Sequence, residues 1–126
     1  MFNPHSLIAG RRLDADPDAV IDAAWIAGRM AAAAALRAKV TDTPYHRLVH
    51  AEADRLPGLV IDRYGDVAVL QANAAGMARL LPEILAALLE VRAWRAVVAR
   101  NDAPVRRLEG LSEEVRLLHG ACLLYT

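Results

Sequence analysis

The strongest candidates for chemistry in this chain are polar residues that follow two expected strands. Arg63 comes at the end of one strand and Arg100 at the end of another. If these ends share one rim of a sheet, their side chains converge there, where guanidinium groups suit two-point contacts with phosphate or carboxylate. The sequence favours a solvated loop rim, with a contact surface for RNA phosphates or a neighbouring domain as the alternative. The set consists of Arg63, Arg100, Asn101, Asp102, Arg106 and Arg107.

Other residue types that often carry catalysis are dispersed. The four histidines lack metal-ligand spacing, the glycines form no phosphate-binding loop, and the serines lack the flanking pattern of an activated nucleophile. Cys122 is the only cysteine, which excludes an intrachain disulfide and favours a buried thiol over a nucleophile. No catalytic, cofactor-binding or metal-binding residue is assigned.

Four carboxylates flank the turn in the middle of the chain and could act as a group. They are Glu52, Asp54, Asp62 and Asp66. Ordinary turn and strand-end chemistry is the alternative, because aspartate side chains bond readily to nearby backbone amides. The sequence favours this second interpretation.

A helix, three strands, a second helix and one or two further strands must position these residues. Asp16 as a cap and Pro17 at the first helical position predict a helix over residues 16–40, with Trp25 and Leu36 on its apolar stripe and Arg37 in solvent. A second helix, with Pro82 in its first turn, is expected around residues 77–88. Strands are expected at 47–53, 59–61, 67–73, 94–100 and 115–118, the second and third forming an antiparallel hairpin. The predicted fold is α+β, a mixed or antiparallel sheet of four to five short strands packed with two helices.

Composition limits the classes of function. The chain has 126 residues, 56% of them hydrophobic, which suits one compact domain. Fifteen basic residues balance fifteen acidic ones, so no long-range attraction to nucleic acid is expected from the chain as a whole. The N-terminus lacks the order of a signal peptide, and no apolar run reaches the roughly 20 residues that span a bilayer. We therefore expect a cytoplasmic protein with no membrane partner.

Three stretches, in this order, carry a resemblance to a known family. They are RLVHAEADRLPGLVIDRYGD at 47–66, VAVLQANAAG at 67–76 and VVARNDAPVRRLEGL at 97–111. Together with Asn3 to Ser6 and Asp16-Pro17, they resemble the bacterial SAM-dependent 23S rRNA methyltransferases that carry an N-terminal PUA domain. The family's run reads His-Gly-Glu-Ala-Asp-Gly-Leu-Pro-Gly, so Arg55 stands where the family usually has glycine.

The resemblance covers residues 1 to 118 and implies a domain organisation. Residues 1–15 would be the remnant of an RNA-binding PUA domain. Residues 16–126 would be the family's central domain, with a linking helix at 16–40 and a sheet and helix at 45–120. The domain that binds S-adenosylmethionine and methylates cytosine C5 has no counterpart here, and the tail ACLLYT differs from the family's continuation, as in a truncated or frameshifted reading frame.

Two hypotheses follow. The first is a non-catalytic fragment that resembles the accessory, substrate-facing domain of an rRNA methyltransferase, binding RNA weakly and adjoining a missing catalytic domain. The second is a free-standing interaction module that docks onto a protein or forms a homodimer through exposed strand edges.

Overall fold

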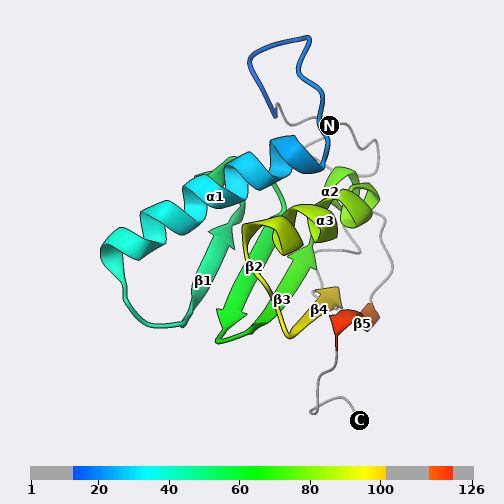
Figure 1. The fold of residues 1–126 in the computed structure, drawn as a ribbon. Helices are drawn as coiled ribbons and strands as arrows, with labels where there is room; N and C mark the ends of the chain where they lie inside the picture. Colours follow the sequence, from blue (N-terminus) through cyan, green and yellow to red (C-terminus); the bar gives the residue numbers. More distant parts are fainter. Residues whose placement is uncertain (1–12, 102–113, 121–126) are drawn as a thin grey trace.

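In the computed structural model, which describes residues 13–101 and 114–120, the protein is a five-stranded sheet with helices on one face (Figure 1). The strands are β1 (Tyr45–His50), β2 (Leu59–Tyr64), β3 (Val67–Ala72), β4 (Ala96–Asn101) and β5 (Glu114–Gly120). They lie in sequence order across the sheet. Only β3 and β4 are parallel, and the other neighbouring pairs are antiparallel. The predicted α+β fold with a mixed sheet is confirmed.

The first helix, α1 (Ala23–Val40), is shorter than the sequence predicted. Asp22 caps it by accepting a hydrogen bond from the Trp25 backbone N–H at 2.9 Å. Asp14 and Asp16 instead each accept from the backbone N–H two residues ahead, at 2.9 and 3.0 Å. Such local bonds compete with a helix, so the expected start of the helix at residue 16 was wrong.

The buried stripe of α1 also differs from the expected one. Ile26, Met30 and Ala33 face the core, whereas Leu36 is 54% exposed. The many small alanines made several helix faces look equally apolar. The choice between these faces depends on the partner surface.

The second helical region is split at Leu80 into α2 (Ala75–Arg79) and α3 (Leu81–Val91). Pro82 lies in the first turn of α3, as predicted. The predicted hairpin between β2 and β3 is present, with Gly65 at a φ of 61° in its turn. The predicted first strand ends early, because residues Ala51–Asp54 form a 3-10 turn.

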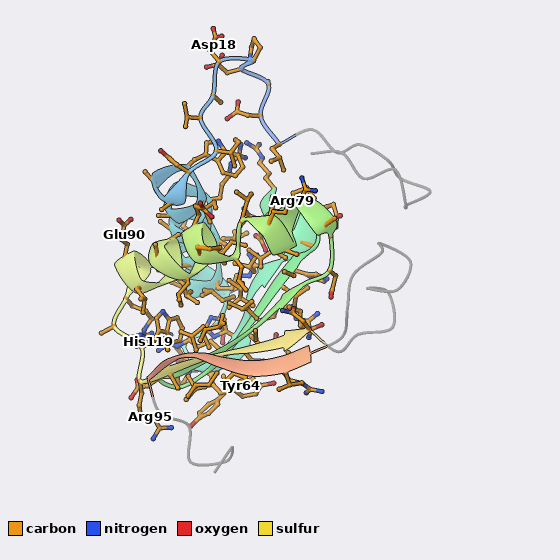
Figure 2. All side chains as sticks on the ribbon, turned by 90° about the vertical axis from the view of Figure 1, so that its right-hand side faces the viewer. Asp18, Tyr64, Arg79, Glu90, Arg95 and His119 are labelled. Atoms are coloured by element: carbon orange, nitrogen blue, oxygen red, sulfur yellow. The ribbon has the colours of Figure 1, made fainter. Side chains whose placement is uncertain are left out.

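The core lies between the helices and one face of the sheet. Ile26 and Met30 of α1 and Leu88 of α3 are fully buried against Ile61 and Leu70 of the central strands. Seen along the sheet, the described helices lie on one side and Tyr64 projects from the other (Figure 2). Tyr64 is 54% exposed and pairs with Tyr45 of β1. Within the described residues no helix is long and apolar enough to cross a bilayer.

Candidate nucleic-acid interface

Arg63 lies near the C-terminal end of β2, on the face that the helices cover. It is two residues beyond the fully buried Ile61, and alternation along the strand puts both side chains on the same face. Its Nε donates a hydrogen bond to the carbonyl oxygen of Gly65 at 3.0 Å, which fixes the guanidinium at this end of the sheet. Among the described residues, no carboxylate lies within ion-pair distance of Arg63.

Arg100 and Asn101 lie at the opposite end of the sheet. Arg63 pairs with Ala68, which pairs with Val97, whereas Asn101 reaches Ala72 at the far end of β3. The expected convergence of these strand ends is therefore wrong for Arg63. The physical reason is that β2 runs antiparallel to both β3 and β4, so the C-termini of β2 and β4 point in opposite directions.

Asn101 has a structural role within the sheet that its sequence context did not predict. It is 2% exposed, and its Oδ1 accepts a hydrogen bond from the Ala72 N–H at 2.9 Å. Arg100 is exposed on the opposite face of β4. Asp102, Arg106 and Arg107, the other members of the predicted set, lie outside the described residues.

Arg63 opens onto a cavity of about 430 Å³ at the end of β1 and β2, beneath the C-terminal ends of α1 and α3. Its polar lining contains a second arginine, Arg92, directly after α3. The complete lining is Ala34, Ala38, Thr41, Asp42, Thr43, His46, Leu48, Arg63, Val91 and Arg92. The fold thus brings together two arginines that are 29 positions apart in the sequence.

The guanidinium of Arg92 is held by weak contacts only. It lies over the Trp94 ring, 5.0 Å from the ring centroid, and its Nη2 is 3.9 Å from Asp66 Oδ1. Its Nε is buried and has no hydrogen-bond acceptor among the described residues. Sequence reasoning did not single out Arg92, because an arginine that follows a helix is ordinarily read as a favourable charge at the helix end.

The lining residues before β1 are organised by short-range hydrogen bonds. Thr41 Oγ1 accepts from the Thr43 N–H at 3.2 Å, and Thr43 Oγ1 accepts from the Tyr45 N–H at 3.3 Å. The Nδ1 of His46 lies 2.8 Å from the carbonyl oxygen of Thr43, which it reaches as a donor. These bonds fix the connector between α1 and β1 at the mouth of the cavity.

The central carboxylates do not form a group. Asp54 is bound to Arg37 and to the His50 N–H, at 2.8 and 2.6 Å through Oδ2. Asp62 accepts from Arg47 Nε at 2.8 Å, an interaction that raises the pKa of Arg47. Asp54 accepts from a nearby backbone amide, as the sequence favoured, whereas Asp62 forms an ion pair with Arg47 of the neighbouring strand. Among the described residues no three His, Cys, Asp or Glu side chains are placed to hold a metal ion.

The chain is similar in sequence to part of known ribosomal RNA methyltransferases. No protein-family model matches the chain. The chain is 35% identical over 122 residues to the ribosomal RNA large subunit methyltransferase I of Aliivibrio fischeri strain MJ11, covering 94% of this chain. It is 36% identical over 123 residues to the enzyme of the same name from Vibrio cholerae O395. The chain is homologous to part of these proteins. It spans 31% and 30% of their lengths.

Solved structures share the fold. A protein described as a SAM-dependent methyltransferase from Streptococcus mutans matches 90% of this chain with a TM-score of 0.67 and 16% identity, over 27% of its own length. A second, described as a methyltransferase complexed with SAH, matches 82% of this chain with the same TM-score and 17% identity, over 26% of its own length. At these identities the likeness concerns the fold alone. In both structures the matching region is a minor part of a longer chain.

Proposed function

We propose that this chain is a non-catalytic, substrate-facing domain of the rRNA methyltransferase type, and that it contacts RNA through its arginines. The proposal rests on the sequence similarity to a ribosomal RNA methyltransferase. The alignment covers 94% of this chain and 31% of that enzyme. Methyl transfer then belongs to the other two thirds of such an enzyme. As the resemblance implies, the target would be cytosine C5 and residues 1–15 would be the remnant of a PUA domain. The proposed location is the cytoplasm.

The described residues do not fit S-adenosylmethionine. Gly58 and Gly120 are the described glycines that approach a neighbouring segment most closely. A Cβ at Gly58 would lie 2.5 Å from the Ala74 Cβ, and a Cβ at Gly120 would lie even closer to the Arg95 carbonyl oxygen. These close approaches are filled by protein and leave no cradle for a ligand. We therefore assign no step of methyl transfer to these residues.

RNA affinity should be weak and salt-sensitive, because a chain of zero net charge neutralises few phosphates. The test is fluorescence anisotropy of the full chain with a labelled single-stranded fragment of 23S rRNA at several salt concentrations. We expect binding that weakens steadily with salt, and no methyl transfer from radiolabelled S-adenosylmethionine. Turnover by this chain alone, or no binding even at about 50 mM salt, would contradict the proposal.

A second candidate function, self-association, is favoured by the sheet face that the described helices leave open. Tyr45 is 65% exposed there, and Val115 and Leu117 on the edge strand β5 are 41% and 42% exposed. An edge strand with exposed apolar side chains can pair with a second copy. Sedimentation equilibrium separates the two candidates: a stable dimer that binds no RNA would favour this one.

A further inference from the structure

We propose that the cavity between Arg63 and Arg92 binds one backbone phosphate of RNA. This inference rests on the proposed function and names the chemistry of its contact. Both arginines line the cavity, one from the end of β2 and the other from just after α3. Two guanidinium groups that converge from separate elements make a clamp for an anion with several oxygens.

Neither guanidinium group is tightly paired with a carboxylate, although Arg92 lies within ion-pair distance of Asp66. Arg63 uses Nε for the Gly65 carbonyl, and this is the one hydrogen bond of its side chain among the described residues. Its terminal nitrogens therefore have donors left for a ligand. Arg92 is placed by the Trp94 ring, and its contact with Asp66 at 3.9 Å is longer than a hydrogen bond.

The buried Nε of Arg92 is a second and independent observation. A buried N–H donor that lacks an acceptor is unfavourable, and proteins rarely retain one. Among the described residues Nε has no acceptor, although the side chain as a whole is 34% exposed. A ligand reaches this buried Nε only if the side chain shifts into the cavity, where a phosphate oxygen would supply the missing acceptor.

Other charges at the cavity limit which ligand it can take. Asp42 lines it, and the C-terminal ends of α1 and α3 add partial negative charge. Asp66 beside Arg92 counts as well, so two guanidinium groups meet two carboxylates and the site is close to neutral. That balance suits a singly charged phosphodiester better than a multiply charged free phosphate. The volume of about 430 Å³ leaves room for the attached sugar.

Single-residue variants test the site. Arg63→Gln and Arg92→Gln each remove one charge and keep a polar side chain, whereas Arg63→Lys keeps the charge and loses the two-point geometry. Arg79→Gln is the matched control, because Arg79 is an exposed arginine on α2, towards the opposite end of the sheet (Figure 2). Circular dichroism and a thermal melt on each variant establish that it is folded.

We expect Arg63→Gln and Arg92→Gln to weaken binding of the labelled 23S rRNA fragment about tenfold each. Each should also reduce the slope of log K against log salt by about 0.7. Arg63→Lys should fall between wild type and Arg63→Gln, and Arg79→Gln should match wild type. If Arg63→Gln does not fold, Arg92→Gln and Arg63→Lys carry the test.

The outcomes separate the site from the proposed function. A wild type that binds RNA, with Arg63 and Arg92 variants that bind equally well, overturns the site and leaves the proposed function standing. A wild type that binds no RNA overturns both. Amide chemical shifts of His46 and Arg63 should also move with dimethyl phosphate at constant ionic strength. Shifts with acetate and none with dimethyl phosphate would identify a protein carboxylate as the occupant and overturn the proposal.

Discussion

Arg37 of α1 and Asp54 of the turn after β1 form a two-point ion pair, with nitrogen–oxygen distances of 2.5 and 2.8 Å. Their side chains are 17% and 4% exposed. Asp54 also accepts a hydrogen bond from the His50 N–H at 2.6 Å, so one carboxylate ties the helix to the turn. The expectation that Arg37 is solvated was wrong, because its helical face meets this turn.

Loss of Arg37 should therefore destabilise the fold. Arg37→Met leaves the buried Asp54 carboxylate without its counter-charge, and we expect the free energy of unfolding to fall by about 3 kcal/mol. Urea denaturation measures this loss. The control is Arg47→Met, which breaks the pair with Asp62 on a side chain that is 47% exposed. It should cost less than about 1 kcal/mol. Equal losses of stability in the two variants would contradict the claim that the Arg37–Asp54 pair stabilises the fold more than the exposed Arg47–Asp62 pair does.

Glycine should stabilise the turn between β1 and β2. Ala51 and Arg55 have φ angles of 45° and 60°, in the left-handed region that disfavours side chains. In the family's run His-Gly-Glu-Ala-Asp-Gly-Leu-Pro-Gly, glycine stands at the positions of both residues. We expect Ala51→Gly and Arg55→Gly each to raise the free energy of unfolding by about 0.5 to 1 kcal/mol.

Ala32→Gly is the control for these two variants. Ala32 is exposed within α1, where glycine should cost about 1 kcal/mol. Urea denaturation gives all three values. A loss of stability at Ala51 and Arg55 as well would show that their backbone is not under strain.

Gly58 should tolerate no side chain. Its φ is 79°, and a Cβ would lie 2.5 Å from the Ala74 Cβ and 2.9 Å from the Ala74 nitrogen. Gly58→Ala should lower the free energy of unfolding by more than about 2 kcal/mol. Gly28→Ala in α1, where nothing lies within 4 Å, should instead raise it by about 1 kcal/mol. Thermal melts of the two variants should therefore shift in opposite directions.

Asp14 should contribute stability that is lost on acidification. The hydrogen bond from Trp25 Nε1 at 2.9 Å, with help from the Asp16 N–H and Arg29, holds the pKa of Asp14 below its ordinary value of 3.8. A carboxyl group with a lowered folded-state pKa stabilises the fold above 3.8, and this contribution disappears as pH falls through the folded-state pKa.

Asp14→Asn isolates this contribution from that of the other carboxylates. The difference in unfolding free energy between wild type and the variant should shrink from pH 6 to pH 3. Urea denaturation at both values measures it. A difference that stays constant or grows towards low pH would contradict the assigned direction.

Local patterns predicted much of the fold. The β2–β3 hairpin follows from Gly65 between two β-branched stretches, and the start of α3 follows from Pro82. The start of α1 could not be derived from capping residues alone, because Asp16 and Asp22 are both good caps. Asp22 caps the helix, because the Asp16 side chain is bound to a nearby backbone N–H and because the helix that begins after Asp22 buries Ile26.

The candidate site was only partly predictable. Arg63 was found because it ends a strand in a recognisable run, but its partner Arg92 carries no signal in the sequence. The pairing depends on how α3 returns over the sheet, a long-range relationship that local pattern does not determine. The sequence assigned Asn101 to an interface, whereas its side chain accepts a hydrogen bond from the Ala72 N–H. A polar residue at a strand end can serve the sheet itself.

The most direct test of the central claim, that this domain faces RNA, is ultraviolet cross-linking of the chain to the 23S rRNA fragment with mass-spectrometric mapping of the modified peptides. We expect cross-links in the segments that line the Arg63–Arg92 cavity, around His46 and around Arg92, and none on α2 near Arg79. Cross-links that are absent, or spread evenly over the surface, would contradict the claim.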